Sequence, residues 1–135
     1  MSANPDEAAS TPMRGAPVAH LRADAALAKL PGPGGARFAA LFEHGTLVVE
    51  IYAPRGHDPQ TPHTRDELYV VAQGSGTFFD GMSRKPFGPA DLIFVAAGTP
   101  HRFEAFSDDL VVWVMFYGPE GGEPAANHES EDGRS

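Results

Sequence analysis

Between residues 37 and 117 the chain alternates short apolar runs with turn residues, and this alternation restricts the fold more than any other feature. The runs are rich in Val, Phe, Tyr, Leu and Ile, which favour strands, and they are separated by Gly, Pro and Asp, which favour turns. Strands this short and this evenly spaced predict an all-β antiparallel sandwich or barrel. The predicted strands are Phe38–Phe42, Leu47–Ala53, Leu68–Ala72, Thr77–Phe79, Leu92–Val95, His101–Phe106 and Leu110–Tyr117.

The segments on either side of these strands have a different composition. Apolar residues between 19 and 30 recur with a loose helical spacing, and the run Pro31–Gly35 would end a helix sharply, so we expect a short helix there. We predict a flexible arm containing this helix at residues 1–36, a single barrel domain at 37–118, and a disordered acidic tail at 119–135. A chain of 135 residues suits one such domain.

Composition argues against several kinds of partner and of site. A net charge of −8 disfavours binding to nucleic acid and to anionic membranes, because such binding depends on clustered Lys and Arg. No apolar run approaches the ~20 residues that span a bilayer, and the N-terminal sequence lacks the features of a signal peptide. The absence of cysteine excludes disulfides and thiolate metal sites. We therefore predict a cytoplasmic protein with no nucleic-acid or membrane partner.

Histidine placement points to chemistry, because an imidazole inside an apolar barrel must be paired or bound. His63 and Glu67 lie four residues apart at the entry to a strand and can face the same side of it. His101 follows a turn made rigid by glycine and proline. Two histidines and a carboxylate can bind Zn²⁺ with a water, or non-haem Fe(II) with open positions. On spacing alone, these three residues could instead be two solvated histidines at strand ends and a surface glutamate.

Two motifs support the metal site. The stretch Gly56–Gly74 resembles the first motif of the cupin superfamily, which reads glycine, His-x-His, a glutamate three or four residues later, and a glycine after six more. His63, Glu67 and Gly74 occupy the positions of the second histidine, the glutamate and the closing glycine.

The stretch Ala90–Phe106 resembles the second cupin motif, Gly-x5-Pro-x-Gly-x2-His-x3-Asn, and matches it at Gly98 and His101. The resemblance covers about residues 38–117, which is the whole predicted barrel. It implies a small single-domain cupin, whose fold is a jelly-roll barrel, also called a double-stranded β-helix.

The sequence departs from these motifs at four positions. Thr61 stands where the first histidine is expected, and alanines at 90, 96 and 105 replace the leading glycine, the proline and the asparagine of the second motif. Cupins commonly bind metal through three histidines and the glutamate, so one imidazole is missing here. The site therefore has three protein ligands and a water, or recruits His57 or Gln60, or binds no metal.

The resemblance implies that His63, Glu67 and His101 hold one divalent transition metal, Fe, Zn, Mn or Ni, in an apolar pocket that takes a small organic molecule. Tyr69 shares the strand face of Glu67. Its hydroxyl could hydrogen-bond a substrate or a metal-bound water, which makes it the candidate catalytic residue. Arg65 lies beside the ligands and could steer a carboxylate to them.

The reaction does not follow from the family, because cupins include dioxygenases, isomerases, decarboxylases and lyases as well as sugar-binding regulators and storage proteins. One prediction is a metal-dependent enzyme of dioxygenase, isomerase or lyase type. The alternative is a non-catalytic small-molecule-binding or structural cupin with a degenerate metal site. Small cupins usually associate through sheet edges, and Leu110–Tyr117 carries more apolar surface than one barrel face needs, so we also predict a homodimer.

Overall fold

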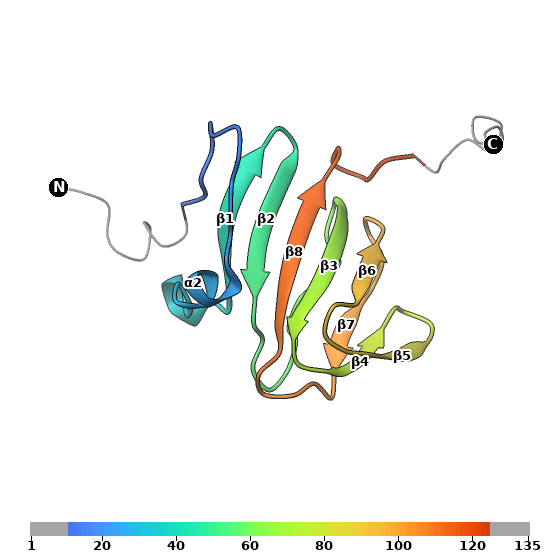
Figure 1. Cartoon of the computed structure of the whole chain (residues 1–135). Coiled ribbons are helices and arrows are strands. Elements are labelled where there is room, and N and C mark those ends of the chain that lie inside the picture. Colours follow the sequence, from blue (N-terminus) through green and yellow to red (C-terminus); the bar gives the residue numbers. More distant parts are fainter. Residues whose placement is uncertain (1–10, 125–135) are drawn as a thin grey trace.

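The structure, a computed structural model, describes residues 11–124. Within them a short helix, α2 (Ala23–Leu27), and a 3-10 turn, η1 (Pro33–Gly35), precede the strands. The prediction of an all-β fold with a short N-terminal helix is confirmed (Figure 1). The strands are β1 (Phe38–His44), β2 (Leu47–Tyr52), β3 (Asp66–Gln73), β4 (Gly76–Phe79), β5 (Arg84–Phe87), β6 (Leu92–Val95), β7 (Arg102–Glu104) and β8 (Val111–Tyr117).

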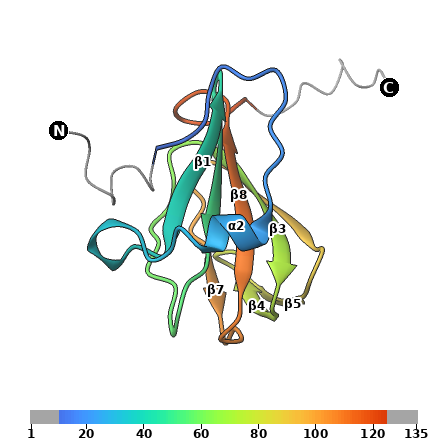
Figure 2. The ribbon, with the colours of Figure 1, turned by 60° about the vertical axis from the view of Figure 1, so that its left-hand side comes forward.

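The strands form two antiparallel sheets. The large sheet has the order β1-β2-β8-β3-β6, and the small sheet has the order β5-β4-β7. The last strand, β8, therefore lies at the centre of the large sheet, between β2 and β3. The small sheet lies toward the end of the large sheet that contains β3 and β6 (Figures 1 and 2). This arrangement of two sheets is the predicted jelly roll.

The main core lies between the two sheets. The large sheet contributes Val112 and Val114 from β8 and Tyr69 from β3, and the small sheet contributes Phe103 from β7. The rings of Tyr69 and Phe103 meet edge-on, with 4.9 Å between their centroids, a geometry that aromatic pairs favour. Phe116 packs against the same cluster. Of the two alternate faces of β8, the one that carries these valines and Phe116 therefore faces the interior.

A second core lies on the outer face of the large sheet. Ala26 of α2 is buried against Ile51 and Val111, and Trp113 packs at the margin of this cluster. Both faces of β8 thus find apolar contacts, which accounts for its uninterrupted apolar sequence. The helix has five residues, fewer than the helical spacing between 19 and 30 covers, and its N-cap residue Arg22 makes no side-chain capping bond.

Strand β5 was not predicted, because its sequence, Arg-Lys-Pro-Phe, is mostly polar and contains a proline. It lies at the edge of the small sheet, where it pairs with β4 alone. Proline and exposed charges are tolerated at such an edge. Asp80 closes the intervening turn by accepting hydrogen bonds from the backbone N–H groups of Met82 and Ser83, at 2.9 and 2.8 Å.

The predicted arm and tail lie partly outside the described residues, and their mobility stays a prediction. In the described part of the arm, the Met13 N–H donates to the Leu41 carbonyl at 2.8 Å, and the Glu43 N–H donates to the Met13 carbonyl at 2.9 Å. These two bonds attach the segment before α2 to β1. No helix within residues 11–124 is long and apolar enough to cross a bilayer.

Candidate metal centre

The three predicted ligands come from separate parts of the chain. Glu67 lies near the start of β3, His101 immediately precedes β7, and His63 lies in the irregular segment between β2 and β3. The Gly98 N–H donates to the His63 carbonyl at 2.7 Å. This bond ties the segment that carries His63 to the turn that precedes His101, so the two histidines meet although they are far apart in the sequence.

Ligand atoms of His63, Glu67 and His101 all lie within 4.8 Å of one another. His101 Nε2 is 3.3 Å from Glu67 Oε1, and His63 Nε2 is 3.9 Å from Glu67 Oε2. With bonds of about 2.1 Å, two atoms bound to one ion lie about 3.0 Å apart in octahedral geometry and about 3.4 Å apart in tetrahedral geometry. The group that the motifs predicted could therefore hold one ion after small side-chain movements.

The Glu67 carboxylate is the strongest sign that an ion belongs here. Its side chain is 1% exposed, and neither of its oxygens has a hydrogen-bond partner within the described part of the chain. A buried carboxylate without hydrogen bonds is costly. A divalent cation bound by Glu67 and the two imidazoles would offset that cost, so these residues fit a metal ion.

His101 is oriented for metal binding. Its Nδ1 lies 2.8 Å from the Thr99 carbonyl oxygen, and because a carbonyl only accepts, Nδ1 carries the proton. In the neutral ring the lone pair is then on Nε2, which faces Glu67; such orientation by a carbonyl is common in metal-binding histidines. Burial lowers the pKa of His101, but the Glu67 carboxylate and the Thr99 carbonyl outweigh it, so the pKa is raised.

Gln60 reaches the same point from the segment before His63. Its Nε2 donates to Asp58 Oδ2 at 2.8 Å, which fixes the amide so that Oε1 faces the histidines. Oε1 lies 3.1 Å from His63 Nε2. Asp58 is itself held by the Tyr52 hydroxyl at 2.5 Å. Of the two additional ligands considered from sequence, the structure thus brings Gln60 to the site, whereas His57 is exposed and outside this group.

Tyr69 lies at the base of the centre and is fully buried. Its hydroxyl oxygen is 3.0 Å from Gln60 Oε1 and 3.0 Å from His101 Nε2. Burial and the neighbouring Glu67 carboxylate raise the pKa of Tyr69 well above its ordinary value, so the phenol stays protonated. Its single proton can be donated to either neighbour.

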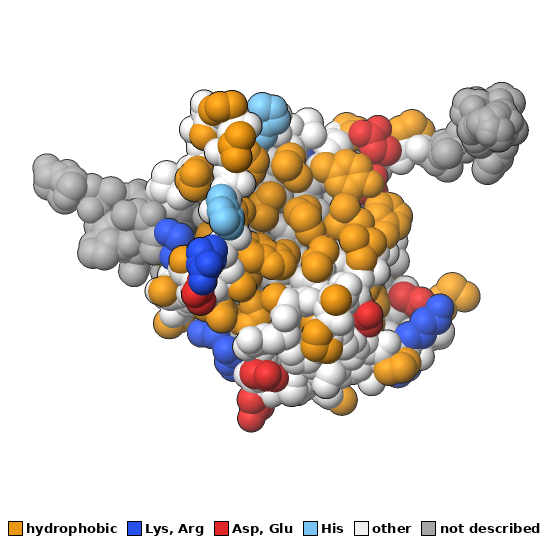
Figure 3. Space-filling model, in the orientation of Figure 1, with side chains coloured by type: hydrophobic (Ala, Val, Ile, Leu, Met, Phe, Trp, Pro, Cys, Tyr) orange, Lys and Arg blue, Asp and Glu red, His pale blue; other side chains and the backbone are white. Residues whose placement is uncertain are grey.

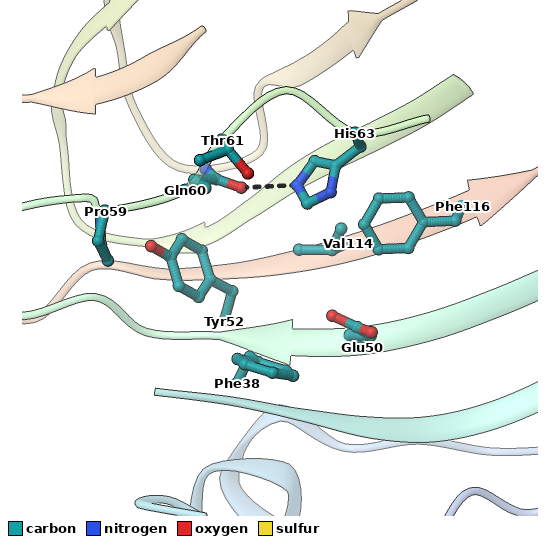
Figure 4. A pocket seen from close by; sticks show the side chains of 9 residues that line it. All are labelled: Phe38, Glu50, Tyr52, Pro59, Gln60, Thr61, His63, Val114 and Phe116. Atoms are coloured by element: carbon teal, nitrogen blue, oxygen red, sulfur yellow. Dashed lines mark hydrogen bonds between the residues drawn. The ribbon is translucent and has the colours of Figure 1, made fainter. Parts of the chain in front are cut away.

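A cavity of about 400 Å³ opens beside His63. Figure 4 shows the side chains that surround it, with His63 and Gln60 on one wall and Glu50 on another. Arg65 donates to the backbone carbonyls of Gly118 and Thr46 instead of entering this cavity. Arg65 therefore does not line this cavity, and its steering of a carboxylate toward the ligands stays a prediction. The lining residues are Phe38, Glu50, Tyr52, Pro59, Gln60, Thr61, His63, Val114 and Phe116.

Comparison with known proteins decides the family. Residues 48–117, just over half of the chain, match the family model described as a cupin domain. The chain belongs to the cupin family. This cupin is 38% identical over 63 residues to an uncharacterized protein of Streptomyces coelicolor. That match covers 47% of this chain and 60% of the Streptomyces protein.

Solved structures share the fold of this cupin. The cupin-2 domain protein of Rhodospirillum rubrum superposes with a TM-score of 0.52 at 20% identity, covering 72% of this chain and 68% of that one. KdgF from Halomonas superposes with a TM-score of 0.53 at 17% identity, covering 62% of this chain and 78% of that one. At these identities the likeness shows the fold alone.

Two residues of the site, Glu50 and Asp58, were not identified from the sequence of this cupin. Glu50 did leave a signal, because it interrupts the apolar strand sequence Leu-Val-Val-Glu-Ile-Tyr. It shares a face with Tyr52, two residues later, and therefore points into the barrel. Asp58 left no signal of this kind, since it lies in a segment without periodic structure.

Proposed function

We propose that this cupin binds one divalent transition metal ion, Fe, Zn, Mn or Ni, through His63, Glu67 and His101. In this proposal the adjoining cavity takes a small organic molecule that a bound ion would help to hold, and the protein acts as a metal-dependent enzyme of dioxygenase, isomerase or lyase type. The buried Glu67 carboxylate, without hydrogen-bond partners among the described residues and between two imidazoles, carries the proposal.

The side chains around the site have separable tasks. A bound ion would supply Lewis acidity and an open coordination position. Gln60, oriented by Asp58, offers an oxygen that can serve as a fourth ligand or hold a water. Tyr69, the proposed catalytic residue, holds a proton beside His101 and Gln60 that a bound molecule could accept. Phe116 packs edge-on against His63, at 4.9 Å between ring centroids, and limits the access of water.

One observation favours the alternative, a non-catalytic small-molecule binder with a degenerate metal site. Thr61 lines the cavity in place of the usual first histidine. A threonine hydroxyl is a poor ligand for a divalent transition metal, so the ion would have fewer strong ligands than in most cupins. The apolar walls of the cavity would still bind an organic molecule in that case.

Metal content tests the proposal. Purified protein should contain about one transition-metal ion per chain by elemental analysis, and the His63→Ala, His101→Ala double variant should contain almost none. The matched control is His57→Ala, which removes an exposed histidine and should keep the metal. Equal metal in the double variant and the control would contradict the site, and a wild type without metal that binds small molecules would favour the alternative.

We further propose that the protein is a cytoplasmic homodimer that assembles through the outer face of the large sheet. Figure 3 shows hydrophobic side chains gathered on this face. Leu92 and Phe94 there are 63% and 53% exposed. A second copy is the favoured occupant, because a face without charges complements itself and because homodimer interfaces are more apolar than others. Two cross-strand rows form it: Val49, Met115, Leu68 and Phe94, and Trp113, Val70 and Leu92.

A further inference from the structure

We propose that Glu50 selects the molecules that the cavity accepts, and that the ligand class is a small, largely apolar organic amine bearing a positive charge. The metal-binding end of the molecule would meet His63, and the ammonium group would meet the carboxylate of Glu50. This inference rests on the proposed function, because it assumes an ion at the centre, and it adds the chemistry of the substrate.

The strand register places Glu50 inside the barrel. Glu50 pairs with Val114 on β8, and Val114 pairs with Tyr69 on β3. Directly paired residues point to the same face of a sheet, and Val114 and Tyr69 belong to the interior core. In Figure 4 the Glu50 carboxyl group points into the cavity from β2, across from His63.

Nothing among the described residues balances the charge of this carboxylate. The side chain of Glu50 makes no hydrogen bond or ion pair with any residue between 11 and 124, and no lysine or arginine in that range lines the cavity. Burial and the like charge of Glu67 raise the pKa of Glu50 to about 7. A cation inside the cavity would supply the missing partner and favour the ionised form.

The remaining walls suit the rest of such a molecule. Phe38, Tyr52 and Phe116 present aromatic rings to the cavity, and aromatic faces attract cations as well as apolar groups. The volume of about 400 Å³ suits a small organic ligand. An anionic group near β2 would instead meet the uncompensated charge of Glu50, so carboxylates and phosphates should be rejected at this wall.

Three matched catechols test the proposal, because each can bind a metal ion through the same two oxygens while their side chains differ in charge. They are 4-ethylcatechol, which is neutral, dopamine, which is cationic, and 3-(3,4-dihydroxyphenyl)propionate, which is anionic. Their affinities for the zinc-loaded protein would be measured by calorimetry at pH 8, without oxygen. Dopamine should bind about tenfold or more tighter than the propionate, an effect expected for one charge pair in a partly buried site.

Glu50→Gln should reduce this preference to within about threefold while leaving the affinity for 4-ethylcatechol unchanged, which shows that the variant is folded. The control Asp108→Asn removes one negative charge at an exposed position outside the cavity and should keep the preference. Equal binding of the three catechols, or a preference that survives in Glu50→Gln, would overturn the proposal alone. If none of the three catechols binds the zinc-loaded protein, both this proposal and the metal-centred function are overturned.

Discussion

Replacing Glu50 by glutamine should stabilise the metal-free protein, and the gain should grow with pH. Burial and Glu67 raise the pKa of Glu50 from 4.5 to about 7. The folded protein therefore holds this proton more tightly than the unfolded chain does. Between these two pKa values the unfolded chain ionises at Glu50 while the folded protein does not, so the free energy of unfolding falls as pH rises. The loss becomes constant only well above pH 7.

The size of the effect follows from the pKa shift. Each pKa unit corresponds to about 1.4 kcal/mol, so a rise from 4.5 to about 7 destabilises the folded state by at most about 3 kcal/mol above neutral pH. At pH 5.5 roughly 1.4 kcal/mol of this is already present. Glutamine resembles the protonated side chain and does not ionise, so its advantage over Glu50 should grow by about 2 kcal/mol between pH 5.5 and 8.5.

Urea unfolding between these pH values, with a chelator present, measures the difference directly. The exposed-site variant Asp108→Asn should show a difference from wild type that changes little with pH. A Glu50→Gln advantage that stays constant with pH, or a variant less stable than wild type at pH 8.5, would refute the assignment of Glu50 as a half-buried, uncompensated carboxyl group.

Two further variants test the ligand set and the assembly. Thr61→His adds an imidazole to a cavity wall beside His63. The variant should retain metal against a chelator about tenfold better than wild type, by analogy with the losses caused by disturbing metal-site shells. Retention no better than in the exposed control Thr64→His would mean that residue 61 does not face the ion. Phe94→Glu places a charge in the apolar outer face of the large sheet, so light scattering should show a monomer instead of a dimer. Met82→Glu, on the exposed turn before β5, should leave the dimer intact. A wild-type monomer at high micromolar concentration would rule out the dimer.

The strands were predictable because apolar runs and the turn residues that bound them indicate where each strand lies and how long it is. Seven of the eight strands in the described residues follow apolar runs bounded by turn residues, with ends that differ by a few positions. β5 could not be found this way, because an edge strand that pairs on one side needs little apolar surface. The face of β8 that points inward was also undecided by sequence, since both of its faces are apolar; in the fold, one face meets the small sheet and the other meets the cluster that contains α2.

Three residues of the metal centre were predictable from sequence, whereas the position of a fourth, Gln60, was not. Motif spacing identified His63, Glu67 and His101, which the fold brings within 4.8 Å of one another. The position of Gln60 was left open, because the segment between β2 and β3 has no periodic structure from which a side-chain direction can be inferred. Its orientation depends on Asp58, which in turn accepts a hydrogen bond from the Phe103 N–H on β7 at 2.9 Å. Such a contact exists only in the folded chain.

The charges of the cavity connect the metal ion to the choice of ligand. Without an ion, burial and the like charge of Glu67 raise the pKa of Glu50 to about 7, so about half of the Glu50 side chains are protonated at neutral pH. A divalent cation at His63, Glu67 and His101 would remove the repulsion and lower the pKa of Glu50. Glu50 would then be ionised at neutral pH and able to pair with an ammonium group. Binding of the metal should therefore strengthen the preference for cationic ligands, because the ion and the ligand neutralise two carboxylates that share one cavity.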